Sequence, residues 1–400
     1  QAGAVDVLDN SSGLNITASG ASFNLAGLDQ TIARLDGVAG GIVTNNSAAV
    51  GDAATLTIAA GGGSYAGDLT ETGGDTLALT KSGSGTQTLN VGTGTYNGAT
   101  LVSGGTLRMA STASFGTAAG STTANGGTLD AAFTGTANEG LVLHGTGDGG
   151  AGALQGSNTG TLAGSVNLAS AATINVDNGA AGNVDFTISG NISGAGGNTL
   201  TKIGPDTLVL SGNNSYAGAT QINAGVLKLG AATGIGSGSV VTIAAGATFD
   251  VNDQSATLGS LSGGSGTLDL GLGSLAASDD IDLTGITVVI AAAGSGNQTL
   301  RAGSDGSGSL IVDALTKSST GNLTLIAPTL IDINGDVAVN AGNYATFKAV
   351  HLNKVPVIAA VQGFVLGGGS GICGAADIVI AADDASFGLA KAFDRHADHQ

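Results

Sequence analysis

Few residues of this chain combine the types and the spacing that chemistry needs. Asp332, Asn334 and Asp336 place carboxylate and amide oxygens at alternate positions around Gly335, as the first half of a calcium-binding loop does. The twelfth position of such a loop requires Glu, and Asn343 stands there. We therefore favour a polar turn between two strands and predict no metal site.

Three of the four tyrosines occur in the pattern Tyr-x-Gly, at Tyr65, Tyr96 and Tyr216. An aromatic ring at a repeated surface position could stack on a sugar. The alternative is structural: the ring covers the edge of a repetitive fold at a turn, beside a glycine that allows close approach. Because the tyrosines follow the period of a repeat, we favour the structural interpretation.

The other candidates for acid–base or metal chemistry are isolated. Asp279 and Asp280 are adjacent, so in a strand their side chains point to opposite faces and make a poor catalytic pair. His144 has no metal-ligating neighbour, and His396 and His399 fit an ordinary solvated terminus. The chain has no nucleophile elbow, phosphate-binding loop or zinc-protease motif. We predict no catalytic residue before position 347 and no cofactor.

The composition favours many short strands. The 400 residues include 72 glycines and carry only 10% charged side chains, yet 42% are hydrophobic. This hydrophobic content argues against disorder. With 11 basic residues and a net charge of −18, the chain lacks a face that could bind nucleic acid. It has no apolar run of membrane-spanning length, and the single Cys373 excludes a disulfide framework.

One stretch occurs twice, at residues 79–109 and 200–229. Both copies open with Leu-Thr-Lys, carry Tyr-x-Gly-Ala-Thr in the middle, and close with Gly-x-Leu followed by a basic and an apolar residue. Apolar and polar residues alternate between glycine and asparagine breaks, which predicts strand, turn, strand, turn, strand. In the second copy Ile222, Val226 or Leu227, and Leu229 would face inward. A single unit cannot bury that face, so we predict a β-solenoid of stacked units.

Weaker repetition extends the solenoid along the chain. Residues 23–37 and 249–263 share Phe, Asp-Gln and a final Leu-x-Gly, and Leu-Thr-Lys recurs at residues 315–317. Residues 64–67 repeat the Ser-Tyr-Ala-Gly of the second copy, which indicates a trace of a third copy. At about 20–30 residues per coil, residues 1–346 would form about 12–17 coils.

The double repeat resembles the autotransporter-associated β-strand repeat of passenger domains in Gram-negative bacteria. The resemblance implies an all-β fold, a right-handed parallel β-helix (β-solenoid), exposed at the cell surface or secreted. It also implies a structural or adhesive role without catalysis, and host-cell surfaces or glycans as partners. The chain starts at Gln1 without a leader and ends without amphipathic barrel strands. We therefore expect the signal peptide and the translocator barrel in a longer parent protein.

The last fifty residues have a different character. Threonine is frequent up to Thr346 and then vanishes, while four of the 11 basic residues lie beyond it. We place a boundary here, with a second segment at 347–400. An apolar strand at 355–363, a glycine turn, a helix ending near Ala376 and a second strand at 377–382 would form an α/β unit.

This segment resembles the centre of a crotonase (enoyl-CoA hydratase/isomerase) domain, through PVIAAVQGF, LGGGSG and ADIVIAADDASFG. The resemblance implies that the backbone N–H of Gly368 belongs to an oxyanion hole. Gly371 occupies the place of the first catalytic Glu, and Phe-Gly is followed by Leu389 and Ala390 without the second Glu. Ala302 to Asp305 has the letters of the other oxyanion turn but lies in passenger-like sequence. An acyl-CoA enzyme is therefore the alternative function, built on an incomplete, truncated fragment.

Overall fold

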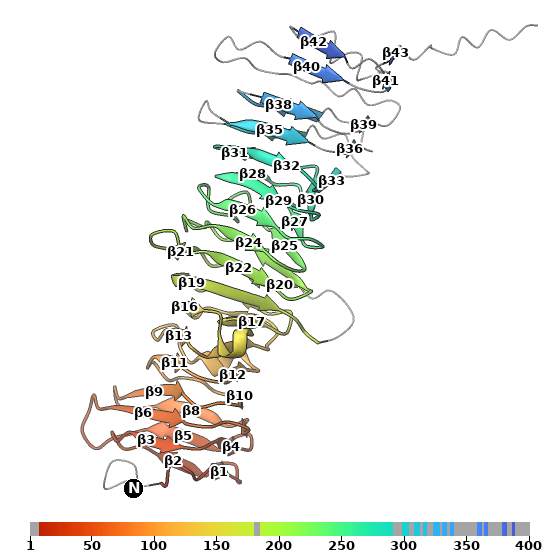
Figure 1. The fold of residues 1–400 in the computed structure, drawn as a ribbon. Helices are drawn as coiled ribbons and strands as arrows, with labels where there is room; N and C mark the ends of the chain where they lie inside the picture. The colour runs from red at the N-terminus through yellow and green to blue at the C-terminus, as the bar shows by residue number, and fades with distance from the viewer. Residues whose placement is uncertain are drawn as a thin grey trace, which may run out of the picture.

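The computed structural model describes residues 8–179, 185–290, 298–303 and 308–312, and short strands beyond them. Those short segments are residues 315–317, 323–328, 330–333, 337–339, 358–361, 364–366, 378–381 and 386–388. The chain is a parallel β-solenoid of about 13 turns with almost no helix, and its strands stack into an elongated rod (Figure 1). The predicted all-β solenoid and its number of coils are confirmed.

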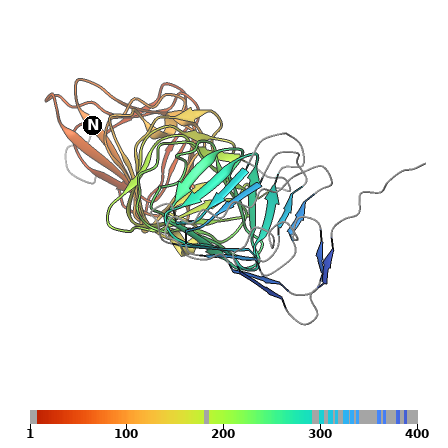
Figure 2. The same ribbon diagram turned by 90° about the horizontal axis from the view of Figure 1, so that it is seen from above.

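Strands from successive coils stack in three columns. Figure 2, turned by 90°, shows the coils one behind another along the rod. Pairing between successive strands is parallel throughout the described residues, as expected where each turn lies over the last. The second column runs without a break and contains β1 (Leu14–Ile16), β4 (Leu35–Gly37), β7 (Ser64–Tyr65), β10 (Thr86–Leu89), β12 (Thr106–Met109), β14 (Thr128–Ala131), β17 (Leu154–Gly156), the end of β19 (Val166–Val176), β22 (Leu200–Ile203), β24 (Thr220–Ile222), β26 (Val240–Ile243), β29 (Ser260–Gly263), β32 (Ile281–Leu283), β35 (Ser309–Val312) and β38 (Leu330–Ile333).

The other two columns are interrupted. The first contains β3 (Gln30–Ile32), β6 (Ala53–Ile58), β9 (Thr76–Lys81), β11 (Thr100–Val102), β13 (Thr122–Asn125), β16 (Leu141–Gly145), the start of β19 and β21 (Ile192–Gly194). A separate sheet contains β28 (Ser255–Leu258), β31 (Ser274–Ala277), β34 (Gln298–Arg301) and β37 (Leu323–Ile326). The third column contains β2 (Ser22–Asn24), β5 (Ile42–Asn45) and β8 (Asp68–Glu71), then β15 (Thr136–Ala137), β18 (Thr161–Leu162), β20 (Asp185–Ile188), β23 (Thr207–Leu210), β25 (Val226–Leu229), β27 (Thr248–Asp250), β30 (Thr267–Gly271), β33 (Thr287–Ile290), β36 (Leu315–Lys317) and β39 (Val337–Val339). Two short 3-10 helices, η1 (Thr112–Phe115) and η2 (Asp148–Gly150), lie between strands.

The period-two pattern places one side of each strand inside. In the second copy of the repeat, Ile222, Leu227 and Leu229 are fully buried, whereas Val226 is half-exposed. Leucine, isoleucine and valine from the coils between Ile16 and Leu325 form one continuous core. No coil could bury these side chains alone, so stacking supplies the stability. The inward positions predicted from the alternation are confirmed, and Leu227 is the inward residue of its pair.

The two copies of the repeat occupy different columns. Leu-Thr-Lys of the first copy lies in β9 and stacks on β11 of the first column. Leu-Thr-Lys of the second copy lies in β22, which stacks on the end of β19 in the second column. The long strand β19 causes the shift, because its start pairs with β16 and its end pairs with β17. The second copy of the repeat therefore starts one column further around the rod than the first copy.

The weaker sequence repeats correspond only in part to repeated elements of the structure. Both Phe-containing stretches form strand, left-handed turn and two strands, with positive φ at Ala26 and Gly27 in one and at Asn252 and Asp253 in the other. The supposed third copy is not equivalent, because Tyr65 pairs with Leu89 of β10. Tyr96, its sequence counterpart, lies seven residues after Leu89. The short Ser-Tyr-Ala-Gly match was therefore misleading.

In the C-terminal segment, β40 (Ile358–Val361) pairs in parallel with β42 (Ile378–Ala381). In the same way β41 (Phe364–Leu366) pairs with β43 (Ser386–Gly388). The two predicted apolar strands are thus present and parallel. The expected glycine turn and helix lie outside the described residues, and the boundary near residue 347 stays a prediction. Among the described residues, no helix is long and apolar enough to cross a membrane.

Candidate functional site

Several residues that the sequence singled out lie outside the described part of the chain. They are Gly368 of the expected oxyanion hole, and also Cys373, His396 and His399. Of the three residues weighed as calcium ligands, Asp332, Asn334 and Asp336, only Asp332 is described, through its backbone in strand β38. Over the described ranges, no group of three or more His, Cys, Asp or Glu side chains could hold a metal ion.

The three Tyr-x-Gly tyrosines lie inside the solenoid. Tyr65, Tyr96 and Tyr216 have at most 1% of their surface exposed. The Tyr65 hydroxyl lies within hydrogen-bond distance of the backbone oxygens of Gly41 and Asp68, both at 2.8 Å, and its one hydrogen can be donated to either. A ring in the core cannot stack on a sugar, so the structural interpretation was right, although the rings fill the interior of the coil instead of covering its edge.

In the two full copies, the tyrosine hydroxyl meets the threonine of Tyr-x-Gly-Ala-Thr. Tyr216 Oη lies 2.8 Å from Thr220 Oγ1, and Tyr96 Oη lies 3.2 Å from Thr100 Oγ1. Tyr96 Oη also donates to the Ser114 carbonyl at 2.7 Å. Burial raises the pKa of Tyr216 to about 12. The motif therefore encodes a buried hydrogen bond across one corner of the coil.

Replacing Tyr216 by phenylalanine is expected to lower the free energy of unfolding by about 1–2 kcal/mol. The hydroxyl of Thr220 keeps a second partner, since it lies 2.8 Å from Ser239 Oγ, and this limits the loss. Chemical denaturation of the wild type and the variant measures the difference. An unchanged midpoint would contradict the role assigned to the buried hydroxyl.

The lysines of Leu-Thr-Lys are buried, a feature that our reading of the sequence missed. Lys81 and Lys202 have 0% of their surface exposed. The Lys202 ammonium donates to the carbonyls of Ile203 at 2.8 Å, Gly204 at 2.9 Å and Ala224 at 3.2 Å. Each lysine thus joins the turn after its own strand to the turn of the next coil. The sequence does indicate this burial, because the period-two alternation puts the lysine on the same inner face as the leucine two residues earlier.

Burial of these ammonium groups costs free energy, since charge is stabilised by water. It lowers the pKa of Lys202 to about 8, against an opposing effect of the Asp206 charge. It lowers the pKa of Lys81 as well. Carbonyl dipoles replace part of the lost hydration. These lysines therefore serve the fold, and they are poor candidates for catalysis.

The stability of the protein is expected to rise between about pH 8 and pH 10 through Lys202. An unfolded lysine keeps its proton up to about pH 10.4, whereas folded Lys202 loses its proton near pH 8. In this window the unfolded state binds more protons, so a higher pH favours the folded state, by about 2 kcal/mol. Denaturation of the wild type and Lys202→Met at both pH values isolates this gain, because tyrosine ionisation affects both proteins alike. An equal pH dependence would refute the assignment.

The remaining candidates of the sequence analysis are dispersed. His144 lies half-exposed in β16, and Asp279 and Asp280 are both exposed beside a turn. In the second column Arg108 of β12 forms an ion pair with the buried Asp130 of β14, with Arg108 Nη1 2.5 Å from Asp130 Oδ2. Ser157 Oγ donates to the other oxygen of Asp130 at 2.5 Å. Pairing of this kind ties neighbouring coils together.

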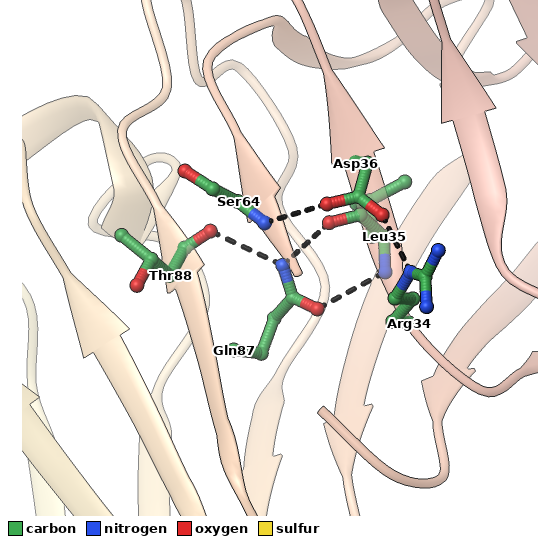
Figure 3. A network of polar contacts seen from close by, with 6 residues as sticks. All are labelled: Arg34, Leu35, Asp36, Ser64, Gln87 and Thr88. Carbon is green, nitrogen blue, oxygen red and sulfur yellow. Dashed lines mark hydrogen bonds and ion pairs between the residues drawn. The ribbon is translucent and has the colours of Figure 1, made fainter. Parts of the chain in front are cut away.

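Gln87 makes an unusual bridge between coils (Figure 3). Its buried side-chain amide accepts from Leu35 N at 3.0 Å and donates to Leu35 O at 2.7 Å. It also donates to the carbonyl of Thr88 at 3.1 Å. The coil in between passes Gly63, where a Cβ would lie 2.7 Å from Gln87 Oε1. The amide thus supplies the hydrogen bonds to the Leu35 backbone that the coil in between does not make at this position.

One buried carboxyl remains without a full set of partners. Glu139 is 3% exposed, and its Oε1 accepts from Thr122 Oγ1 at 3.2 Å. Its Oε2 has no hydrogen-bond partner. Burial raises the pKa of Glu139 to about 7. Glu139 is one of the residues that line a pocket of about 250 Å³, which the sequence analysis did not detect.

Comparisons with known proteins support both resemblances. The passenger-associated-transport-repeat family matches residues 79–109 and 200–229, and the enoyl-CoA hydratase/isomerase family matches residues 334–393. No solved structure matches the chain.

Two curated proteins are similar to a stretch of 53 residues. This stretch is 51% identical to the (7aS)-7a-methyl-1,5-dioxo-2,3,5,6,7,7a-hexahydro-1H-indene-carboxyl-CoA hydrolase of Mycobacterium tuberculosis (strain ATCC 25618 / H37Rv), covering 13% of this chain and 22% of that protein. It is 53% identical to the protein of the same name in Rhodococcus jostii (strain RHA1), covering 13% of this chain and 20% of that protein. The chain thus spans about a fifth of the length of these relatives. The chain is a parallel β-solenoid carrying two repeats of the autotransporter passenger type, together with a segment similar to enoyl-CoA hydratase/isomerase proteins.

Proposed function

We propose that the solenoid is a non-catalytic passenger segment, displayed at the surface of a Gram-negative bacterium or secreted from it. It acts as a structural or adhesive rod, with host-cell surfaces or glycans as its partners. The supporting observation is that both matched repeats are coils of a single solenoid. Their recurring tyrosines and lysines are buried in hydrogen bonds within the rod. What the repeat provides is therefore a stable scaffold.

The location can be tested on cells that produce the protein. Antibodies against the solenoid are expected to label intact cells, and external protease is expected to remove the label while a periplasmic marker survives. Labelling that requires permeabilised cells would refute surface display, unless the solenoid is recovered from the medium. For the adhesive role, beads coated with the purified chain should be retained on host cells or glycan arrays better than beads coated with the heat-unfolded chain. Equal retention would remove the adhesive part of the proposal.

Acyl-CoA chemistry through the C-terminal segment is the second candidate function. It is favoured by the family match at 334–393 and by the two relatives named as CoA hydrolases. Gly371 stands where the resemblance calls for a catalytic Glu, so we expect no hydration of crotonyl-CoA and no release of CoA from it. Turnover that is abolished by Gly368→Pro, which removes the backbone N–H, would overturn the non-catalytic assignment.

A further inference from the structure

Asparagine precedes glycine at Asn97, Asn125, Asn178 and Asn334. In such a pair the backbone nitrogen of the glycine can attack the side-chain carbonyl carbon of the asparagine and close a succinimide ring, because glycine has no Cβ to obstruct the approach. The reaction needs a side chain that is free to rotate and a backbone N–H that is not held in a hydrogen bond. The structure describes the first three of these pairs, and they differ in both respects.

The pair formed by Asn97 and Gly98 is held at both ends. The Asn97 side chain donates to Glu71 Oε1 and accepts from Thr117 Oγ1. The N–H of the buried Gly98 donates to the carbonyl of Leu77 at 3.1 Å. These hydrogen bonds must break before the ring can close, so the structure protects Asn97.

The pair formed by Asn178 and Gly179 is held at its glycine. The Gly179 N–H, the group that would react, donates to Asp177 Oδ1 at 2.8 Å. The N–H of Asn178 donates to Asp206 Oδ2 at 3.0 Å, which fixes the backbone before the reacting side chain. At least one hydrogen bond must therefore be given up here as well.

The pair formed by Asn125 and Gly126 is free at both ends. Asn125 is the last residue of β13, and both residues are exposed. Within the described part of the chain, no hydrogen bond reaches the Asn125 side chain or the Gly126 N–H. Gly126 has a φ of 97°, which glycine adopts without strain. The turn after β13 thus requires the same glycine that makes Asn125 reactive.

We propose that Asn125 is a site of covalent modification, at which the side-chain amide is lost by spontaneous deamidation. The Gly126 nitrogen forms a bond to Asn125 Cγ and the bond from Cγ to Nδ2 breaks. The proton of the Gly126 N–H leaves with the amide nitrogen as ammonia. Water then opens the succinimide at either of its carbonyl groups, which gives aspartate or isoaspartate. The reaction needs no oxidant, metal or enzyme, and it proceeds whether or not the chain is displayed on a cell.

The products would change the outer face of the first column. His144 of β16 is the in-register neighbour of Asn125 in the next coil, and neighbouring strands lie about 4.8 Å apart. Both residues follow buried ones, Ala124 and Leu143, so both side chains point outward. Aspartate would place a carboxylate beside the imidazole. Isoaspartate would add a methylene group to the backbone and displace the start of β14.

Peptide mapping by mass spectrometry on the intact, folded chain measures the reaction at each pair, since exchange of NH2 for OH raises the mass of the peptide. During incubation at neutral pH we expect Asn125 to deamidate at least about tenfold faster than Asn97, and several-fold faster than Asn178. In guanidinium chloride the three pairs should react at similar rates, because the protecting hydrogen bonds are gone. Asn125→Gln, an exposed substitution that should leave the fold intact, is expected to remove the mass gain from its peptide.

The central measurement uses the wild type alone, so it does not depend on the folding of any variant. Equal rates at Asn125 and at either Asn97 or Asn178 in the folded chain would overturn the proposal. An Asn125 that reacts more than about tenfold slower in the folded chain than in guanidinium chloride would overturn it as well. Methylation by a protein isoaspartyl methyltransferase detects isoaspartate separately. Both products are expected, and aspartate alone would indicate direct hydrolysis and refute the succinimide step.

Discussion

Replacing Gly218 by alanine is expected to lower the free energy of unfolding by about 4 kcal/mol. Gly218 is the glycine of Tyr-x-Gly in the second copy of the repeat. A Cβ there would lie 1.9 Å from the carbonyl oxygen of Asn198 and 2.3 Å from its carbon. These are backbone atoms of the coil below, so no side-chain rotation can relieve the overlap. The two coils would have to separate, breaking their ladder bonds.

The chain contains a matched control for this substitution. Gly238 also lies in a turn, but a Cβ there meets nothing within 4 Å and its φ is not positive. Gly238→Ala should therefore change stability by less than about 0.5 kcal/mol, or raise it slightly. Gly98 of the first copy, where a Cβ would lie 2.2 Å from the Leu77 oxygen, should behave like Gly218. Similar unfolding midpoints for Gly218→Ala and Gly238→Ala would contradict the close packing of these coils.

Gln87→Leu is expected to cost about 3 kcal/mol. Leucine fills a similar volume, but it leaves the N–H and C=O of Leu35 without the partners that the amide supplies. Both groups are buried beneath the loop at Gly63, where water has little access. Two orphaned backbone groups cost more than the loss of one ordinary hydrogen bond.

Urea unfolding of Gln87→Leu beside Gln221→Leu provides the measurement. Gln221 is exposed on β24, so its replacement should change stability by less than about 0.5 kcal/mol. Gln87→Glu adds a sharper criterion, because a carboxylate oxygen would face the Leu35 oxygen and repel it. That variant should regain stability at acidic pH, where the carboxyl can donate. Equal effects at positions 87 and 221 would refute the bridging role.

Gln30 repeats this device near the start of the described chain. Its amide accepts from Leu8 N at 3.1 Å and donates to Leu8 O at 3.2 Å and to Thr31 O at 2.7 Å. In both cases a buried glutamine amide accepts from the N–H and donates to the C=O of a single residue in another coil. The sequence analysis assigned neither glutamine to the interior, because an isolated glutamine is normally exposed.

The sequence alone determined the strands and their stacking. Period-two alternation between glycine breaks can be satisfied only by short strands with one buried face, and the 79–109 and 200–229 repeats require neighbours of the same kind to cover it. The same alternation fixed Ile222 and Leu229 as core residues. The same alternation also places Lys202 on the inner face, a position that we did not predict because lysine is charged.

The tertiary structure decided which faces the elements occupy and which polar atoms meet. The two repeats lie in different columns because β19 continues from the first column into the second as a single strand, without a turn between them. No local sequence pattern encodes where such a turn is left out. The partners of Gln87 lie 52 residues away, and the pocket at Glu139 exists because a 3-10 helix in one coil meets a strand in the next. Such contacts depend on the summed length and rotation of whole coils. A periodic sequence specifies that coils stack, whereas their relative rotation is set only when all turns have formed.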